Sequence, residues 1–302
     1  MKLTRQKLSS TPVLLLASLS LFWGLNWPGM KIILSEMTVW WFRAMCLVVG
    51  GILLLSLSAM SGNRWRPFRR EIKPIMFCGT FAVLGWMVFS AYGVSLMPAG
   101  RASIIAFTMP VWASLLAAPI LGERITPVKI GGLLLGVAGL ATLIGPDLII
   151  LQQAPLGALC MLGAAMTWAM GTVLIKRINW EIPVLSNIAW QLLYAAVPVT
   201  TVAILLEPLP DLTTLSTPAI IAIIYIFVGP MSYCQWAYFK SVTLLPASIA
   251  AIGTLTIPIV GVYSSHLILG EPVGIYEVIA LLLVLSALAL VLLVPALKAR
   301  AK

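Results

Sequence analysis

Long apolar runs, separated by short polar connections, recur from one end of the chain to the other. Each run is about 20 residues long, the length that an α-helix needs to cross a hydrocarbon core of about 30 Å. Short connections make successive helices antiparallel neighbours. The pattern predicts an all-α membrane protein with ten transmembrane helices, at residues 11–33, 38–57, 74–97, 102–121, 127–144, 156–175, 183–205, 217–239, 248–269 and 275–294.

Composition and charge support this reading. Hydrophobic residues make up 61% of the 302 residues and charged residues only 9%, whereas charged residues are about a quarter of soluble domains. The net charge of +10 lies in the connections rather than on one folded face, so the lipid bilayer is an expected partner and nucleic acid is not.

The distribution of Lys and Arg predicts the orientation. With the N-terminus in the cytoplasm, all but three of the 19 Lys and Arg residues fall on the cytoplasmic side, as the positive-inside rule requires. Lys31 and Arg101 fall on the other side, and Arg43 falls within a span. We therefore predict a multi-pass protein of a bacterial inner (plasma) membrane with both termini cytoplasmic.

The second half of the chain repeats the first. A shift of 148 residues places Leu-Met-Pro-Ala at 96–99 on Leu-Leu-Pro-Ala at 244–247, and 11 of the 28 positions in 96–123 are then identical. The repeat unit is five helices, an odd number, so the second copy must enter the membrane from the opposite side. This predicts a 5+5 inverted-topology repeat with halves 1–147 and 148–302, an architecture typical of secondary transporters.

Short motifs recur at corresponding places in these helices. The first helix holds Trp-Gly-Leu-Asn at 23–26, the second holds Trp-Phe-Arg at 41–43, and the fourth and ninth end in Leu-Gly-Glu at Glu123 and Glu271. With the ten spans, these motifs resemble the EamA-type branch of the drug/metabolite transporter (DMT) superfamily over nearly the whole chain. The resemblance implies a gradient-driven exporter of small metabolites, often amino acids or their derivatives, that uses no ATP.

One face of the first helix is a candidate wall of a binding cavity. Trp23, Asn26, Trp27 and Met30 recur at helical spacing, so they share a face. They either line a cavity in which one amide orients a ligand, or they pack against neighbouring helices. Both interpretations stay open.

Arg43 is the one basic residue well inside a predicted span, about 8 Å from the outer end by helical rise. Its guanidinium either pairs with a substrate carboxylate or snorkels outward to lipid headgroups. The modest depth favours snorkelling. The shift of 148 places Arg43 on Gln191, which forms a polar stripe with Asn187 and Tyr194. That stripe is expected to face the interior, where it binds substrate or another helix.

Three further aromatic or polar residues are candidates for the same cavity. Gln235 and Trp236 follow Gly-Pro at 229–230, where we expect a break in regular helical hydrogen bonding. Trp168 falls on Trp23 when the chain is shifted by 145 residues. Aromatic residues near a helix end are often membrane-interface residues instead, but Gln235 and Trp236 lie deeper in the span.

Two prolines are candidates for mechanical elements rather than for ligands. Pro110 and Pro258 occupy equivalent positions in the fourth and ninth helices, with Thr108 and Thr256 beside them. Each proline removes a helical hydrogen bond. We hypothesise that these kinks bend as gates during alternating access; the alternative is static kinks that fit the packing.

Several motifs are absent. The sequence has no GxxxxGK[ST] phosphate loop, no HExxH and a single histidine, His266, so an ATPase, a zinc protease or a Ser-His-Asp hydrolase is not expected. His266 is a weak candidate for proton coupling. The four cysteines show no metal-ligand spacing, and we expect no metal, no cofactor and no enzymatic activity.

Together these features predict an exporter of small zwitterionic or weakly anionic metabolites, with amino acids first. All nine acids fall at or beyond helix ends, which disfavours cationic drugs as substrates. An uptake carrier or exchanger, or a non-transporting sensor or assembly protein, is the alternative. Glycines at 132 and 136 in the fifth helix offer a face for close helix contact. We expect intramolecular packing there, in a monomer or weak homodimer.

Overall fold

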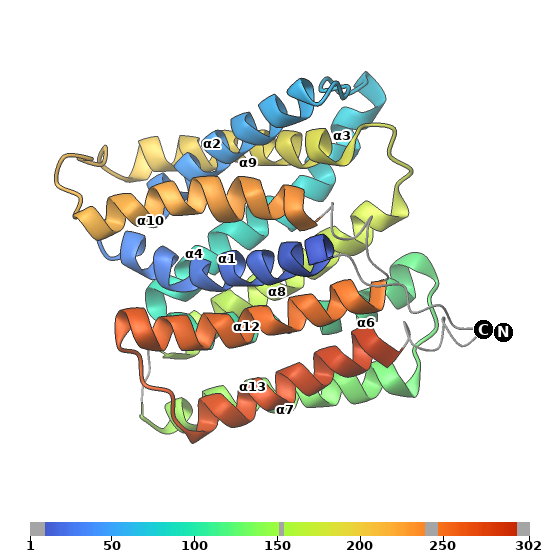
Figure 1. The fold of residues 1–302 in the computed structure, drawn as a ribbon, viewed down its shortest axis with the longest axis vertical. Helices are drawn as coiled ribbons and strands as arrows, with labels where there is room; N and C mark the ends of the chain where they lie inside the picture. The colour runs from blue at the N-terminus through green and yellow to red at the C-terminus, as the bar shows by residue number, and fades with distance from the viewer. Residues whose placement is uncertain (1–9, 151–153, 239–246, 295–302) are drawn as a thin grey trace.

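The computed structural model describes residues 10–150, 154–238 and 247–294, and side chains at 14–143, 156–238 and 255–294. Within these residues all regular structure is helical and no strand is present. Each predicted apolar segment is helical in most of its described part and close to its predicted ends; the segment at 102–121 is interrupted by a turn at residues 107–108. The helices (Figure 1) are α1 (Ser10–Leu34), α2 (Val39–Met60), α3 (Arg69–Gly79), η1 (Thr80–Gly85), α4 (Trp86–Leu96), α5 (Ala99–Ala106), α6 (Met109–Leu121), α7 (Pro127–Ile150), α8 (Ala154–Arg177), α9 (Val184–Leu206), α10 (Thr217–Val228), η2 (Gly229–Tyr233), α12 (Ala247–Leu269), α13 (Ile275–Leu288) and η3 (Ala289–Leu293).

The chain is a multi-pass membrane protein by the length and composition of these helices. Helices satisfy their own backbone polar groups, as a hydrocarbon environment requires. Two shorter apolar stretches, Pro127–Leu143 and Leu255–Leu269, are the parts of α7 and α12 whose side chains are described. In the described residues seven stretches are long and apolar enough to cross a membrane: Val39–Met60, Arg69–Leu96, Ala99–Leu121, Leu156–Arg177, Val184–Leu206, Thr217–Tyr238 and Ile275–Leu293.

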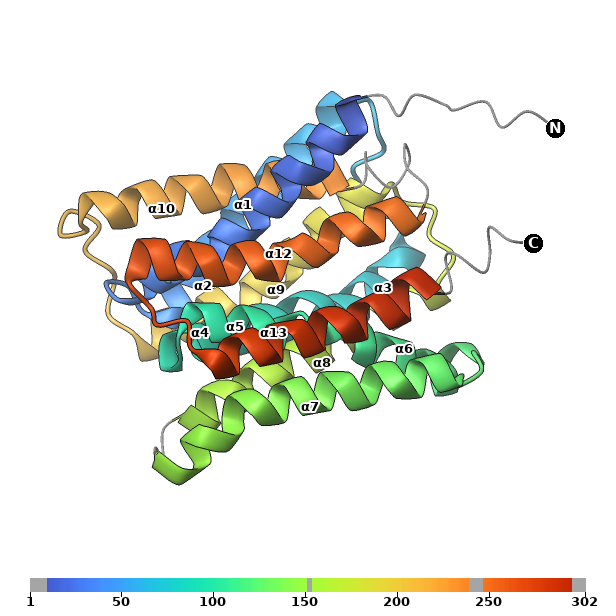
Figure 2. The ribbon, with the colours of Figure 1, turned by 60° about the horizontal axis from the view of Figure 1, so that its bottom comes forward.

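The pairs of packed helices stay the same when each helix is exchanged for its equivalent in the other half. α2 packs on α9 at one edge of the bundle and α7 packs on α13 at the opposite edge (Figures 1 and 2). Between them α1 packs on α12 and α10, while α8 packs on α6 and α4. Each contact of α1 with the second half therefore has a counterpart contact of α8 with the first half.

Two of the three described π-helical segments lie at equivalent places in the two halves. η1 continues α3 at Thr80, and η2 begins at Gly229, which is the residue that follows the position equivalent to Thr80. In η2 the Ser232 hydroxyl donates a 2.8 Å hydrogen bond to the Phe227 carbonyl. The break predicted at Gly-Pro 229–230 is confirmed, because Pro230 has no N–H to donate. Such π segments concentrate at functional sites.

The two candidate kinks differ in backbone structure. α5 ends at Ala106 and α6 begins at Met109, with Pro110 in its first turn, so the fourth apolar segment is interrupted there. The Thr108 hydroxyl donates to the Ile105 carbonyl at 2.7 Å and accepts from the Trp112 indole at 3.0 Å. Pro258 lies inside α12, which is continuous from Ala247 to Leu269.

Glycines of α7 allow a close approach to α13. A Cβ at Gly132 would lie 2.4 Å from Val291 Cγ2, and one at Gly139 would lie 2.9 Å from Val284 Cγ2. The predicted small-residue face is therefore used within the chain, as we expected, and the contact closes one edge of the bundle.

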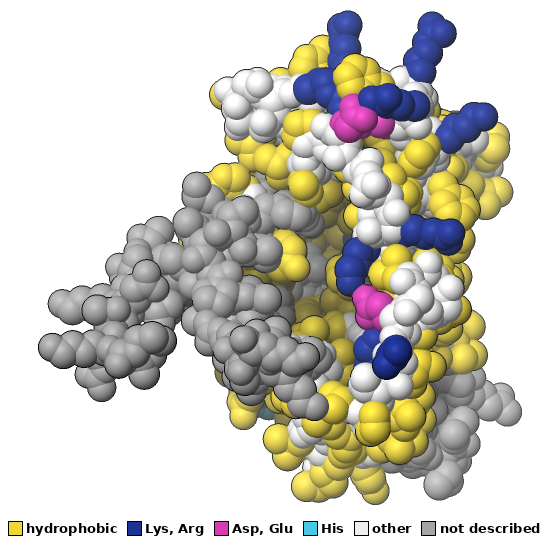
Figure 3. Space-filling model, turned by 90° about the vertical axis from the view of Figure 1, so that its right-hand side faces the viewer, with side chains coloured by type: hydrophobic (Ala, Val, Ile, Leu, Met, Phe, Trp, Pro, Cys, Tyr) yellow, Lys and Arg dark blue, Asp and Glu magenta, His cyan; other side chains and the backbone are white. Residues whose placement is uncertain are grey.

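The bundle has two ends with different charge. One end, here the α4–α5 end, carries the connections 35–38, 97–98, 207–216 and 270–274. The other, here the α2–α3 end, carries the connections 61–68, 122–126 and 178–183, and Lys and Arg side chains gather on it among acidic ones (Figure 3). Seven residues predicted to be cytoplasmic lie outside the described residues: Lys2, Arg5, Lys7, Lys240, Lys298, Arg300 and Lys302.

Candidate functional site

Arg43 points into the bundle. Its side chain shares the buried face of α2 with Phe42, Cys46 and Leu47, and the residue is only 4% exposed. Nη2 donates a 2.8 Å hydrogen bond to the Ser90 hydroxyl of α4. The expectation that Arg43 snorkels to headgroups is therefore wrong, because depth along a helix does not determine which face carries the residue.

A methionine sulfur joins Arg43 to the first helix. Met30 Sδ lies 3.8 Å from Arg43 Nη2 and 3.3 Å from the Asn26 amide nitrogen, both of which donate to it. Thioether sulfur is a weak acceptor, so these contacts hold the two donors loosely. Asn26, Met30, Arg43 and Ser90, from α1, α2 and α4, form what we call the Arg43 cluster.

The Arg43 cluster has an unbalanced positive charge. Arg43 Nε is buried and has no hydrogen-bond partner among the described residues. The described ion pairs, at N–O distances up to 4.0 Å, do not include Arg43. The Phe42 ring, 4.9 Å from the guanidinium carbon, gives only partial compensation. A buried, unpaired cation of this kind is costly, and a carboxylate would relieve it with charge-assisted hydrogen bonds.

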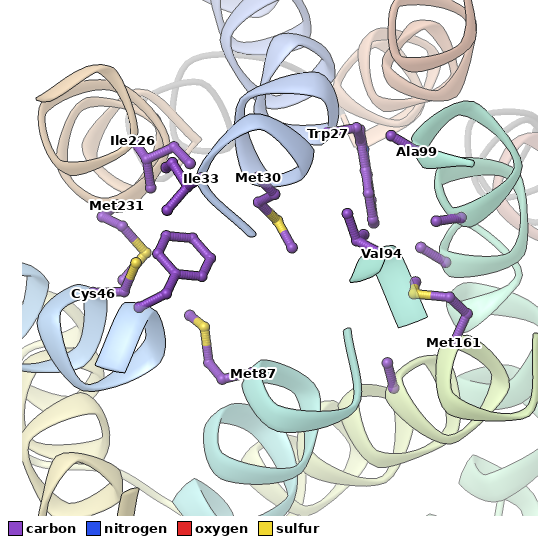
Figure 4. Packing of buried hydrophobic residues seen from close by; sticks show 14 of the residues in the cluster. Trp27, Met30, Ile33, Cys46, Met87, Val94, Ala99, Met161, Ile226 and Met231 are labelled. Atoms are coloured by element: carbon purple, nitrogen blue, oxygen red, sulfur yellow. The ribbon is translucent and has the colours of Figure 1, made fainter. Parts of the chain in front are cut away.

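The helices that carry the Arg43 cluster also contribute buried apolar side chains to the interior. Met30, Met87 and Val94 are buried around one region of the interior, and Trp27 lies beside Val94 (Figure 4). Trp27 is 4% exposed and packs against α12, where a Cβ at Gly261 would lie 3.0 Å from its ring. The Trp23 and Tyr238 ring centroids are 5.8 Å apart. The face predicted from Trp23, Asn26, Trp27 and Met30 thus combines packing with a polar contact.

The polar stripe of α9 faces another helix. Gln191 is 2% exposed and donates a 2.7 Å hydrogen bond to Asn187 within α9. The Tyr194 hydroxyl lies 3.3 Å from the Thr80 hydroxyl of η1, and a Cβ at Gly79 would lie 3.3 Å from both Gln191 and Tyr194 side chains. Of the two roles left open for this stripe, these contacts support helix packing.

The remaining candidates lie apart from the Arg43 cluster in their described contacts. Trp236 is 39% exposed, and its ring centroid is 6.0 Å from that of Tyr233. Trp168 and Gln235 are half-buried. Described hydrogen bonds and ring contacts do not link any of these three side chains to Asn26 or Arg43. His266 is exposed, with Nδ1 2.8 Å from the Glu271 carbonyl oxygen.

Sequence reasoning missed Ser90. Its signal was weak, a single hydroxyl in an apolar segment, although a buried hydroxyl in a membrane helix needs a partner.

Among the described residues no group of three or more His, Cys, Asp or Glu side chains could hold a metal ion. The N–H donors of the Arg43 cluster are suited to hydrogen bonds with an anion in an apolar setting.

Comparison with known protein families identifies the family of this chain. The profile of the EamA-like transporter family matches residues 10–145 and again residues 155–293. The chain belongs to this family. The double match covers both EamA-like segments of the sequence, and it agrees with the resemblance carried by the Trp-Gly-Leu-Asn and Leu-Gly-Glu motifs.

Relatives of this EamA protein are named as transporters. The uncharacterised transporter YvbV of Bacillus subtilis is 29% identical over 285 residues, covering 92% of this chain and 90% of the relative. A probable amino-acid metabolite efflux pump of Escherichia coli is 24% identical over 282 residues, covering 88% of this chain and 89% of that pump. A crystal structure with a TM-score of 0.67 and 19% identity, covering 97% of this chain and 98% of that chain, shows the same fold.

Proposed function

We propose that this EamA protein is a secondary transporter that exports small carboxylate-bearing metabolites, amino acids or their derivatives first, across the inner membrane by alternating access. The single observation that carries the substrate class is Arg43, whose buried guanidinium has an unpartnered Nε and no described carboxylate beside it. The names of two relatives support the same class: the E. coli efflux pump and a probable terminal-alkyne amino-acid exporter of Streptantibioticus cattleyicolor, 31% identical over 121 residues.

In this proposal each residue of the Arg43 cluster makes a different contact. Arg43 donates to the substrate carboxylate through the unpartnered Nε, Ser90 fixes the guanidinium through its bond to Nη2, and the Asn26 amide binds a second polar group. Met30, Met87 and Trp27 surround the apolar part of the substrate. Met side chains adapt to differing shapes, which suits a site that accepts several related metabolites.

The proposed architecture is ten spans in two inverted halves, with both termini cytoplasmic. Support comes from the double family match, from helix pairs that exchanging the halves preserves, and from the equivalent places of η1 and η2. Support for the orientation comes from the Lys and Arg side chains gathered at the α2–α3 end (Figure 3). Since α13 covers the glycine face of α7, we propose a monomer or at most a weak homodimer in the bilayer.

The test is counterflow in proteoliposomes with a panel of amino acids, other metabolites and cations. The parent chain should exchange compounds with a free carboxylate. Arg43→Gln should abolish that exchange, whereas Arg177→Gln, the same substitution at an exposed residue of α8, should not change it. Exchange of cationic drugs alone would refute the substrate class. Absence of exchange for every compound would favour the alternative, a non-transporting sensor or assembly protein.

A further inference from the structure

Lys31 caps the end of α4. Its ammonium group, on the last turn of α1, donates to the carbonyl oxygens of Val94, Ser95 and Met97 at 2.8, 3.1 and 3.0 Å. The last carbonyls of a helix have no partner within the helix, and they carry partial negative charge. A cation at this point therefore satisfies three acceptors at once and ties α1 to the end of α4.

Glu271 caps the start of α5, only a few residues farther along the chain. Its Oε1 accepts a 2.7 Å hydrogen bond from the Ala99 amide, and its Oε2 accepts a 2.9 Å bond from the Gly100 amide. Free N–H groups at a helix N-terminus favour an anion. The α4–α5 connection is thus held by a cation on its carbonyl side and by a carboxylate on its amide side.

These two caps bring together segments far apart in sequence. Lys31, α4 and α5 belong to the first half of the chain, whereas Glu271 follows α12 in the second half. Beside Glu271, Arg101 Nε pairs with Glu277 Oε1 at 2.6 Å, and Glu277 Oε2 accepts from the Gly274 amide at 2.8 Å. The contact therefore joins α5 to both α12 and α13 through their connection.

Behind these caps the contact between α5 and α12 is tight. A pocket lined by Gly100, Arg101, Glu271 and Glu277 has a volume of about 10 Å³, room for about one water molecule. One turn deeper in α5, Ser103 is fully buried, and a Cβ at Gly261 would lie 2.8 Å from its hydroxyl oxygen. A solute cannot pass between α5 and α12 in this arrangement.

The Leu-Gly-Glu motif of the first half, which ends at Glu123, makes different contacts at the other end of the bundle. Glu123 Oε1 accepts a 2.8 Å bond from Lys176, and Oε2 accepts a 3.0 Å bond from Lys129. Both partners are flexible side chains, and the Glu123 side chain is 36% exposed. The two equivalent glutamates therefore differ in this conformation: Glu271 binds backbone amides and Glu123 binds ammonium groups.

We propose that Lys31 and Glu271 form a clamp that holds the α4–α5 end closed, and that release of Glu271 from the α5 amides opens this end during transport. The clamp rests on the proposed function in that the opening serves a substrate path. Both residues are positioning residues: they act on the α4–α5 connection and not on the substrate.

The test is the distance across the α4–α5 end in lipid nanodiscs without substrate. Nitroxide labels at Leu96 and Ile275, both exposed, are introduced after the four native cysteines are replaced, and double electron–electron resonance gives the distance distribution. Glu271→Gln keeps the size and removes the charge, so it weakens two charge-assisted bonds. We expect a longer-distance population whose ratio to the closed one rises about tenfold.

Glu123→Gln is the matched control, the same substitution at the equivalent position, and it should leave this distance distribution unchanged. Lys31→Met should produce the same longer population as Glu271→Gln, and it carries the test if Glu271→Gln does not fold. Distances unchanged in both clamp variants, or shifted equally by Glu123→Gln, would overturn the clamp. Because no substrate is present, absence of flux in the parent would refute the proposed function without affecting this result.

Discussion

Replacing Arg43 by methionine should make the protein more stable and inactive. The guanidinium is 4% exposed and donates to Ser90, while Nε has no described partner. Methionine has a similar length and packs with Met30 and Phe42 without bringing a charge. A residue kept for its chemistry at a cost in stability is expected at functional sites.

The size of the effect follows from two opposing terms. Loss of the bond to Ser90 costs about 1.5–3 kcal/mol, the value for a hydrogen bond to a charged group. Removing the buried charge stabilises the folded state by several kcal/mol, because the desolvation penalty of the charge no longer applies. Exchange of buried ionic groups for apolar ones of similar volume has stabilised other proteins by about 1–4 kcal/mol, and we expect a gain in the lower part of that range.

The assay is thermal unfolding of the purified protein in detergent, and the folded fraction is monitored by size-exclusion chromatography with fluorescence detection. A gain of 1 kcal/mol raises Tm by about 2–4 °C in chains of 150–250 residues, so Arg43→Met should unfold a few degrees above the parent. Arg43→Lys, which keeps the charge, should not be stabilised. A Tm for Arg43→Met several degrees below the parent would refute the reasoning and make Arg43 a structural residue.

Three further outcomes follow from described contacts. Gly171→Ala should lower the free energy of unfolding by about 1–3 kcal/mol through overpacking, because its Cβ would lie 2.4 Å from Ala82. Gly131→Ala, whose Cβ would lie 3.7 Å from Leu290, should be neutral or stabilising in the same unfolding assay. Ser90→Ala should raise the KM for a carboxylate substrate about tenfold, because Arg43 loses its bond to the hydroxyl. Ser114→Ala, which removes a hydroxyl that donates to the Val111 carbonyl of its own helix, should not change the KM; equal KM values for the two variants would contradict the role of Ser90. Hydrogen bonds from Lys176 and then from Lys129 lower the pKa of Glu123 from its ordinary value of 4.5. The stabilising contribution of Glu123 is therefore present above pH 4.5 and is lost as the pH falls through the lowered pKa. The Tm of Glu123→Gln should fall less on acidification than the Tm of the parent, and identical falls would contradict the pairing.

Local sequence features predicted the helices well. The apolar runs and the Gly-Pro break at 229–230 depend on chemistry within a few residues, and η2 begins at that break. The use of Gly132 for close contact also followed from the spacing of the glycines at 132 and 136, because small residues on one helix face permit close contact wherever the partner lies.

Contacts between distant segments could not be predicted in this way. Hydropathy places Arg43 along the membrane normal, but its direction depends on how α2 is rotated against α1 and α4. Glu271 and the Gly100 amide are 171 residues apart in sequence, and no periodicity pairs them. The Leu-Gly-Glu repeat indicated that the two glutamates are equivalent, yet one conformation gives Glu271 and Glu123 different partners.

The central claim, that Arg43 binds a substrate carboxylate, is tested most directly by competition. In parent proteoliposomes, counterflow of a labelled amino acid should be inhibited by the unlabelled amino acid and not by its carboxamide, which has no negative charge for Arg43. Equal inhibition by the acid and the amide would contradict the account.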